Sequence, residues 1–379
     1  MGVGVRAPQP LTIATATEAI VHLQALSVRD FRNLASVDVT FPREGVVVLG
    51  DNGHGKTNLL EAIYYLVLFR SLRGAKDREL VRFDTDGFFV KGTRAGGQSI
   101  TAGFEVHGRR KKVALDGVEV VRLADAVGTV VAVSFSPADR GIVSGGPAGR
   151  RRYLDIVLSL ALPGYLAALT RMRAALRQRN AALRRQRADE ARAFDAPFAA
   201  AAAAVATMRR AWTAAWAERF RGLCDQLGEH GTATLVYEIH NAESSDAGEL
   251  ERALTVTIDR DLRRSVTTVG PHRDDLRLTL DHKDLRTFGS AGQQRTAAIA
   301  LRLIEAATLT EAGGAPPIAL YDDVFAELDA DRQARLLGLI GEELPGQAII
   351  AAPRVSEVPE HLLDRPRWQM QGGRLVPTG

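Results

Sequence analysis

Hydrophobic and polar positions along the chain predict strands in its first part. Residues 21–25 and 37–41 alternate apolar with polar side chains, which is the period of a half-buried strand. Residues 45–49 form a short continuous apolar run, as expected for a fully buried strand. Further along, Asp116-Gly117 separates two apolar stretches and predicts the two-residue turn of a hairpin.

The middle of the chain has helical character instead. Between Arg150 and Cys224, Ala, Leu and Arg predominate, and glycine is almost absent. Pro163-Gly164 and Asp195-Ala196-Pro197 interrupt this stretch, so we expect three helices, two of them long.

Strands and helices surround this helical stretch, which predicts an α/β domain with an inserted helical lobe. We expect helices at 56–69, 291–310 and 332–339, and strands at 232–240, 255–258, 318–321 and 347–351. The expected division is a flexible tail (1–20), a first α/β part (21–134), a mostly helical lobe (135–290) and a second α/β part (291–379).

Composition limits the classes of protein to consider. The chain has 379 residues and a single Cys, which excludes an internal disulfide and a Cys-rich zinc site and fits a reducing cytoplasm. Its longest nearly unbroken apolar run, residues 198–208, is much shorter than the roughly 20 residues of a membrane span. The first 20 residues lack the basic start and apolar core of a secretory signal. We therefore expect a cytoplasmic protein without a membrane partner.

Positive charge is concentrated in one block of the chain. The net charge is +4 overall, but residues 150–192 hold 11 Arg against three acidic residues, a local charge of +8. Such a block points to a polyanion partner. A solvated helix face is an equally good explanation of this block by itself.

A glycine-rich motif follows the buried run at 45–49. It matches the pattern GxxxxGK(S/T) in full, and a helical stretch comes after it. Its residues are Gly50, Asp51, Asn52, Gly53, His54, Gly55, Lys56 and Thr57. Glycines let successive backbone N–H groups face a phosphate, Lys56 would reach the β- and γ-phosphates, and Thr57 would hold Mg²⁺. The competing explanation is a glycine-rich turn with a surface lysine.

Two carboxylates end the apolar strand expected at 318–321. Asp322 would complete the Mg²⁺ site, and Asp323 would orient a water for attack on the γ-phosphate. Taken alone, the pair could equally open the next helix, but a phosphate-binding loop elsewhere in the chain favours the catalytic interpretation.

A third motif, Ser290-Ala291-Gly292-Gln293, opens the helix expected at 291–310. Helix capping by Ser290 is its ordinary explanation. Together with the glycine-rich loop and the paired acids, however, the motif resembles the signature of ABC-type ATPases. A string similar to their D-loop follows at 327–329. In that superfamily the signature of one subunit closes on the ATP held by another.

The chain resembles the RecF family within this superfamily, from about residue 22 to residue 377. A long gap holding helices separates Lys56 from Ser290, as in the SMC-like ATPases of DNA repair. Four strings carry the closer resemblance: Asp30-Phe31-Arg32-Asn33-Leu34, residues 145–155, residues 269–276 and residues 322–329.

The resemblance implies a fold, cofactors and site residues. The fold would be an ABC-type ATPase head, a mixed sheet with flanking helices and an inserted helical lobe. ATP and Mg²⁺ would be the cofactors, Asp323 and Lys56 the catalytic residues, and Thr57 and Asp322 the metal ligands. Besides the glycine-rich loop, the nucleotide-binding residues would be Arg32, Asn33, Ser290, Gly292 and Gln293.

The resemblance also implies partners. The chain would bind gapped or junction DNA as an ATP-dependent homodimer, hydrolyse ATP slowly with DNA stimulation, and help to load recombinase and support the SOS response with RecR and RecO. The arginines expected to contact DNA are Arg150, Arg151, Arg184, Arg185 and Arg187.

Several departures from the superfamily pattern also predict slow hydrolysis. Asp323 stands where transporter motors carry the longer Glu, and no histidine follows the strand ending at 349–353. Residues 134–137 supply no glutamine where a Q-loop is expected, and Ala326 stands where the family more often has Ser.

Two other functions remain open from the sequence. One is an SMC-type structural DNA clamp that uses ATP only to dimerise. The other is a transporter motor, against which the missing histidine argues.

Overall fold

A mixed sheet lies at the centre of the computed structural model, which describes residues 22–240, 246–325 and 330–378. In the described residues this sheet has six strands in the order β15-β14-β3-β13-β12-β8. Strands β14, β3, β13, β12 and β8 run parallel to one another, and β15 is antiparallel to β14. The strands are β3 (Gly45–Leu49), β8 (Ala132–Phe135), β12 (Ile318–Asp322), β13 (Ala348–Ala352), β14 (Arg367–Gln371) and β15 (Arg374–Thr378). Segments far apart in sequence therefore build one sheet.

Side chains of β3 show how the sheet divides the core. Val46 and Val48 point into one apolar cluster and Val47 into another, and all three are fully buried. Because successive side chains of a strand point to opposite faces, a continuous apolar run is what a strand covered on both faces requires.

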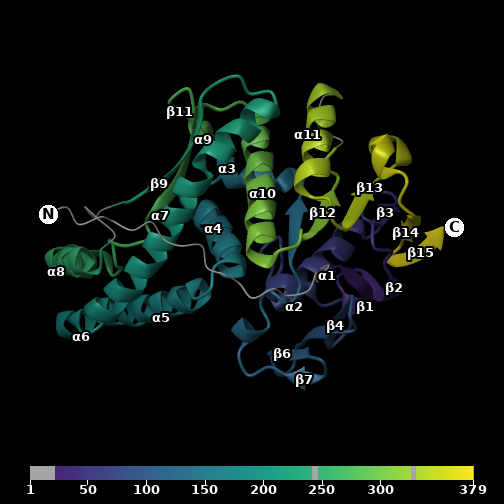
Figure 1. Ribbon diagram of the computed structural model, residues 1–379. Coiled ribbons are helices and arrows are strands. Elements are labelled where there is room, and N and C mark those ends of the chain that lie inside the picture. The colour runs from purple at the N-terminus through teal and green to yellow at the C-terminus, as the bar shows by residue number, and fades with distance from the viewer. Residues whose placement is uncertain (1–21, 241–245, 326–329, 379) are drawn as a thin grey trace, which may run out of the picture.

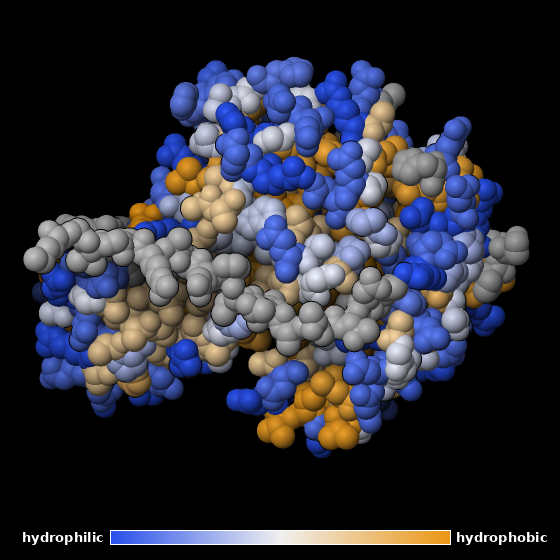
Figure 2. Space-filling view, viewed as in Figure 1, coloured by the Kyte–Doolittle hydropathy of each residue, from blue (hydrophilic) through white to orange (hydrophobic). Residues whose placement is uncertain are grey.

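Helix α1 (Lys56–Leu68) and an antiparallel sheet cover one face of the central sheet. That second sheet has the order β2-β1-β4-β5-β6-β7 within the described residues. Its strands are β1 (Leu23–Phe31), β2 (Leu34–Thr40), β4 (Gly87–Arg94), β5 (Ser99–Glu105), β6 (Arg110–Leu115) and β7 (Val118–Glu119), and the short helices beside it are α2 (Asp77–Leu80) and η1 (Leu123–Asp125). Figure 2 shows an apolar surface around β6 and β7, where Val118 and Val121 are largely exposed.

Helices cover the other face and extend from it as an arm (Figure 1). Against the sheet lie η2 (Pro137–Asp139), α3 (Arg140–Ser144), α4 (Pro147–Ala161), α10 (Ala291–Gly313) and α11 (Ala330–Glu343). The arm comprises α5 (Tyr165–Arg184), α6 (Ala188–Arg192), α7 (Asp195–Gln226), α8 (Ala247–Arg264) and a small sheet of β9 (Ala233–Glu238), β10 (Asp275–Leu280) and β11 (Lys283–Asp284). The remaining short helices are α9 (Leu285–Phe288), η3 (Val355–Glu357) and η4 (Glu360–Leu362).

The expected elements agree with the structure except at one strand. Asp116 and Gly117 form the hairpin turn, both with positive φ (48° and 83°), and the short α6 adds a helix to the three expected in the middle stretch. The strand expected at 255–258 is wrong, because these residues lie inside α8. Asp246 caps that helix, and Leu250, Leu254 and Ile258 recur every fourth residue on its buried face.

Two further expectations concern the whole chain. Among the described residues, no helix is long and apolar enough to cross a membrane. The lobe boundaries at 134/135 and 290/291 stay a prediction.

Candidate nucleotide site

The glycine-rich motif joins β3 to α1. Gly50, Gly53 and Gly55 have φ values of 153°, 82° and 115°, a region that side chains rarely allow. A Cβ at Gly50 would also lie 2.3 Å from the Met370 carbonyl oxygen on β14. Glycine is therefore required here both by the backbone conformation and by the close approach of a neighbouring strand.

Lys56 begins α1 and turns back into the loop. Its ammonium donates to the carbonyl oxygens of Gly50 (2.6 Å) and Asp51 (3.2 Å), and only 4% of the residue is exposed. The loop thus places a cation and the N-terminus of a 13-residue helix at one point. Both features favour an anion, so the residues present fit a phosphate group.

Thr57 and Asp322 meet although 265 positions separate them. The Thr57 hydroxyl donates to Asp322 Oδ1 at 2.9 Å, because β12 and β3 flank β13 in the central sheet. Burial and the neighbouring Asp323 raise the pKa of Asp322, and the bond from Thr57 opposes that shift. One hydroxyl and one carboxylate at the end of a phosphate loop fit Mg²⁺, which takes few protein ligands and completes its shell with water and phosphate.

Asp323 has an unusual conformation for a residue other than glycine. Its φ is 51°, and its backbone N–H donates to the Ala351 carbonyl at 3.1 Å. Its Oδ1 atom is buried and has no hydrogen-bond partner in the described part of the chain. Burial raises the pKa of this carboxyl, and Lys56 acts in the opposite direction. An acceptor held at the Mg²⁺ end of the loop suits a group that takes a proton from water.

Asn33 and Arg32 approach α1 from the end of β1. Asn33 donates to the Gly53 carbonyl at 3.3 Å and accepts from Asn58 at 2.8 Å, so it supports the phosphate loop directly. The Arg32 guanidinium instead donates to Glu61 (3.1 Å) and to the Glu79 carbonyl (3.0 Å). Contact of either residue with the nucleotide stays a prediction.

Glu61 is a site residue that the sequence did not reveal. It is 1% exposed, and Arg32, Arg73 and Ser71 all donate to it. Burial raises the pKa of Glu61, but the bonds from Arg73, Ser71 and Arg32 outweigh burial and leave the pKa below its ordinary value. Nothing in the sequence around Glu61 marks it, since its partners come from two other segments, Arg32 after β1 and Ser71 and Arg73 after α1.

The signature-like motif lies at an exposed helix start. Ser290 accepts from the Gln293 N–H (3.2 Å), and Gln293 accepts from the Ser290 N–H (2.9 Å), which is a capping box. Gly292 allows Arg332 to lie close by, because a Cβ there would lie 2.5 Å from its guanidinium. The expected contact of Ser290, Gly292 and Gln293 with a partner's nucleotide stays a prediction. Ala326 and the D-loop-like string at 327–329 lie outside the described residues.

Comparison with known proteins gives the family of this chain. The family model described as the RecF/RecN/SMC N terminal domain matches residues 22–361. The chain is 38% identical to the DNA replication and repair protein RecF of Anaeromyxobacter dehalogenans strain 2CP-C, over 87% of this chain and 92% of that protein. It is 32% identical to RecF of Halalkalibacterium halodurans, over 95% of this chain and all of that protein. The chain belongs to the RecF family.

Solved structures agree with this assignment. One is the recombination mediator protein RecF of the RecFOR pathway, determined with ATP. It is 30% identical to this chain and has a TM-score of 0.83. The match covers 95% of this chain and 98% of that protein. An Smc head domain from Pyrococcus furiosus has a TM-score of 0.54 at 13% identity and shows a related fold only. The expected ABC-type ATPase head with flanking helices is thereby confirmed.

The five arginines expected to contact DNA lie in two different environments of this RecF-family chain. Arg150 is 3% exposed, and its guanidinium donates to both oxygens of Asp275 (2.8 and 2.7 Å) and to two backbone carbonyls. Every nitrogen of that guanidinium is thus engaged, so the assignment of Arg150 to DNA is not retained. Arg151 is half-buried and donates to the Asp274 carbonyl at 2.7 Å, and its contact with DNA stays a prediction.

The other three arginines, Arg184, Arg185 and Arg187, are exposed where α5 ends. Arg187 pairs with Glu190, which is also exposed. Figure 1 places this turn at the end of the arm farthest from the central sheet, and Figure 2 shows strongly hydrophilic residues there. Their position leaves them accessible to a large anionic partner.

Proposed function

We propose that this RecF-family chain is an ATP-dependent DNA-binding ATPase of recombinational repair and replication restart. The observation that carries the proposal is the 2.9 Å bond between Thr57 on the phosphate loop and Asp322 at the end of β12. It supports a Mg²⁺·ATP site, because the two side chains come from the two motifs that hold the metal in P-loop ATPases. The solved relative with ATP supports the same cofactor.

Each residue of the site would have one task in hydrolysis. The loop N–H groups and Lys56 would bind the β- and γ-phosphates, and Thr57 and Asp322 would hold Mg²⁺, whose charge neutralises the phosphate oxygens. The oxygen of the attacking water would bond to the γ-phosphorus as ADP leaves, and Asp323 would take the proton of that water. An Asp has a shorter reach than a Glu, so we expect slow turnover, stimulated by DNA, that serves as a switch.

ATP would also close a homodimer. The phosphate loop binds its anion from one side, and the Ser290 hydroxyl, the Gly292 N–H and Gln293 begin a 23-residue helix that could cover the other side in a second copy. Two-fold symmetry would then close two ATP sites in one isologous interface. The dimer would therefore be favoured by nucleotide.

The dimer would bind gapped or junction DNA in the cytoplasm. Exposed Arg184, Arg185 and Arg187 are the side chains we assign to DNA phosphates. The RecFOR pathway in which the solved relative acts supports RecR and RecO as partners, with recombinase loading and support of the SOS response as the outcome.

Asp323→Asn tests this function. The variant removes a carboxylate but leaves Lys56, Thr57 and Asp322 in place, so it should bind Mg²⁺·ATP with wild-type affinity and lose at least 100-fold in turnover. It should accumulate as an ATP-bound dimer in sedimentation velocity. Lys56→Ala is the matched control, because it should lose ATP binding itself.

The alternative is an SMC-type structural DNA clamp that uses ATP only to dimerise. Because such a clamp needs no turnover, equal ATP consumption at background level by the wild type and Asp323→Asn would favour it.

A further inference from the structure

Strands β14 and β15 form a hairpin beside the phosphate loop (Figure 1). β14 runs parallel to β3, with Gln369 opposite Leu49, so both strands end at the same edge of the central sheet. The phosphate loop begins where β3 ends, and the two-residue turn of the hairpin, Gly372-Gly373, follows β14 at that edge. The hairpin therefore brings its turn to the loop from the other end of the chain.

Two contacts join this turn to the loop and to the segment that supports it. The Gly373 N–H donates to the His54 carbonyl at 2.9 Å. A Cβ at Gly373 would lie 2.1 Å from the backbone oxygen of Asn33, whose side chain donates to the Gly53 carbonyl. The middle of the loop is thus held between the hairpin and Asn33.

Core packing keeps the hairpin close to the loop. Trp368 and Met370 on β14 are buried in the same apolar cluster as two side chains of β3. The Trp368 ring lies against Phe41 with ring centroids 5.2 Å apart, and Leu375 on β15 packs against the same cluster. Because both strands are fixed in this way, the turn has a defined position, and Gly373 is where it meets the loop.

The bond to His54 sets the direction of one N–H group of the loop. A peptide unit is planar and trans, so its C=O and N–H point to opposite sides. Since the His54 carbonyl points at the hairpin, the Gly55 N–H of the same peptide unit points away from it. No backbone acceptor for this N–H is found in the described part of the chain. Gly55 is the N-cap of α1, so its N–H is available to an anion at the helix N-terminus.

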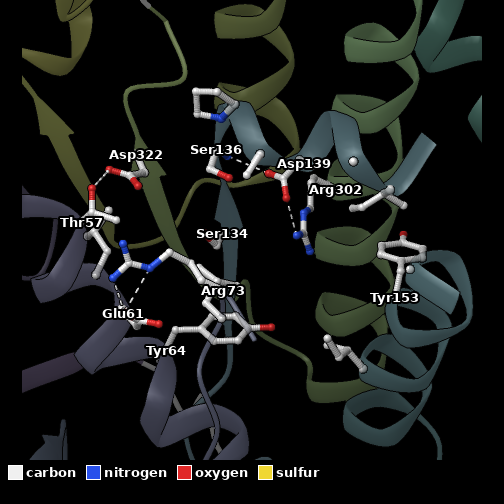
Figure 3. A pocket seen from close by; sticks show the side chains of 18 of the residues that line it. Thr57, Glu61, Tyr64, Arg73, Ser134, Ser136, Asp139, Tyr153, Arg302 and Asp322 are labelled. Carbon is white, nitrogen blue, oxygen red and sulfur yellow. Dashed lines mark hydrogen bonds and ion pairs between the residues drawn. The ribbon is translucent and has the colours of Figure 1, made fainter. Parts of the chain in front are cut away.

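A different contact orders the next residues of the loop. Figure 3 shows Thr57 and Asp322 joined at the start of α1, by the bond of 2.9 Å that places the two metal ligands. Neither of these side chains has a hydrogen bond to the peptide between His54 and Gly55 in the described residues. The metal end of the loop and its earlier N–H group therefore depend on different strands, β12 and β14.

We propose that the β14–β15 hairpin is part of the nucleotide site, and that Gly373 is a positioning residue that sets the phosphate-binding peptide between His54 and Gly55. The ligand chemistry is a polyphosphate chain, on which the hairpin acts through the loop. The inference rests on the proposed function, because that function assigns the loop to ATP. Glycine is required at Gly373 by the close approach of Asn33, whereas a Cβ at Gly372 would meet nothing within 4 Å.

Asparagine at each of the two turn glycines separates the contact from the turn. Gly372 and Gly373 have φ values of 55° and 78°, a region that Asn tolerates better than most residues. Gly373→Asn would press its Cβ against the Asn33 oxygen and move the turn from the loop, so we expect its affinity for Mg²⁺·ATP to fall at least tenfold. Gly372→Asn is the matched control and should bind Mg²⁺·ATP as the wild type does.

Inorganic tripolyphosphate tests whether the hairpin acts through the phosphates. It has the phosphate chain of ATP without the base and the ribose. Isothermal titration calorimetry with Mg²⁺ present should show that Gly373→Asn loses affinity for tripolyphosphate and for ATP by a similar factor. A loss confined to ATP would mean that the turn acts on the base or the ribose, and would overturn the assignment to the phosphate loop.

Binding has to be measured well below the melting temperatures of the three proteins, so that a change in global stability does not alter the affinity. A purely structural role of Gly373 would lower the melting temperature of Gly373→Asn and leave both affinities at their wild-type values. That result would overturn the inference.

Hydrogen exchange in the wild type gives a test that does not depend on folding of a variant. Mg²⁺·ADP is the ligand, because it lacks the γ-phosphate that would close the proposed dimer. Ordering of the loop by ADP should slow exchange of the Gly373 amide at least fivefold, since this amide is bonded to the loop. An unchanged exchange rate at saturating ADP would contradict the coupling between hairpin and loop.

The outcomes distinguish this inference from the proposed function. Wild-type protein that binds Mg²⁺·ATP, together with a Gly373→Asn variant that binds it equally well, would overturn the role of the hairpin alone. A wild type that does not bind Mg²⁺·ATP would overturn the proposed function and this inference with it.

Discussion

The Asp323 backbone has a φ of 51°, a conformation that costs a non-glycine residue roughly 1–3 kcal/mol. The same residue holds a buried carboxylate oxygen without a donor in the described part of the chain. Strain and an unsatisfied acceptor at one residue both reduce the stability of the fold. They are understandable where the carboxylate has to remain available to a reacting water.

The ionised Asp323 carboxyl destabilises the folded chain, so the difference in stability between the wild type and Asp323→Asn should depend on pH. Burial raises its pKa above the ordinary 3.8, so the folded chain binds this proton more tightly than the unfolded chain does. The free energy of unfolding therefore falls as the pH rises through the interval between these two pKa values, and the full cost is present at neutral pH. Asp323→Asn should accordingly be more stable than the wild type at pH 7, because it carries no charge into this partly buried position.

Thermal unfolding without nucleotide, followed from pH 7 downward, measures this difference. It should shrink toward zero below pH 3.8, where the wild-type carboxyl is protonated in both states. A variant less stable than the wild type at pH 7 would contradict the prediction.

Sequence patterns located the residues of local motifs and missed those that act through distant partners. The phosphate loop and the paired acids were recognisable, because glycines, a lysine and two carboxylates occur at fixed spacings next to a strand. Glu61 has no such local mark. Its environment depends on arginines that approach from other segments.

Helix α10 combines a structural and a proposed functional role at its first turn. Ser290 caps the helix, which accounts for its type without reference to ATP. A substitution that destroys the cap would destabilise the helix and confuse any effect on the dimer. A test therefore has to preserve the cap while changing the charge.

Ser290→Asp meets that requirement, because Asp is as good an N-cap as Ser. We expect an unchanged melting temperature and unchanged ATP affinity of the monomer. The added carboxylate would face the γ-phosphate of the second subunit, so the ATP-dependent dimer should weaken at least tenfold in sedimentation velocity. Ser290→Ala, which costs about 1 kcal/mol of cap energy but adds no charge, is the control for loss of the cap. A dimer of wild-type strength in Ser290→Asp would limit Ser290 to capping.

Among the helices and strands, the sequence pattern gave a wrong prediction where β-branched residues occur in a helix. Thr255, Val256, Thr257 and Ile258 have high strand propensity, yet they lie in α8. The Asp246 cap and the fourfold spacing of its buried leucines and isoleucine outweigh that propensity. Polar residues between these buried positions follow the same helical period in the sequence.

Across the whole molecule, arginine has two separate uses. Arg179 and Arg209 are almost fully buried in the arm, where Asp195, Asp261 and Asp155 pair with them. Arginines at the end of the arm are exposed instead. The local charge of +8 at residues 150–192 therefore overstates the surface available to DNA, since Arg150 and Arg179 of that block are buried and paired with acids from outside it.

Removing the exposed group tests its proposed contact with DNA. Arg184→Ala, Arg185→Ala and Arg187→Ala together should reduce the slope of log affinity against log salt by about 2–3, because up to three fewer counterions are released. ATP binding should not change. Replacing three exposed arginines elsewhere, Arg82, Arg122 and Arg354, is the control. Equal slopes in the two triple variants would assign the end of the arm to a solvated surface.

The central sheet has a consequence for synthesis of the chain on the ribosome. Both neighbours of β3 are made about 300 residues after it, since β3 (Gly45–Leu49) pairs with β13 (Ala348–Ala352) and β14 (Arg367–Gln371). At typical elongation rates the phosphate loop therefore waits roughly 15–60 s for the strands that position it. Nascent chains stalled before β13 should fail to retain ATP, whereas chains released after β14 should retain it. Nucleotide binding would thus report that translation has passed the last strands.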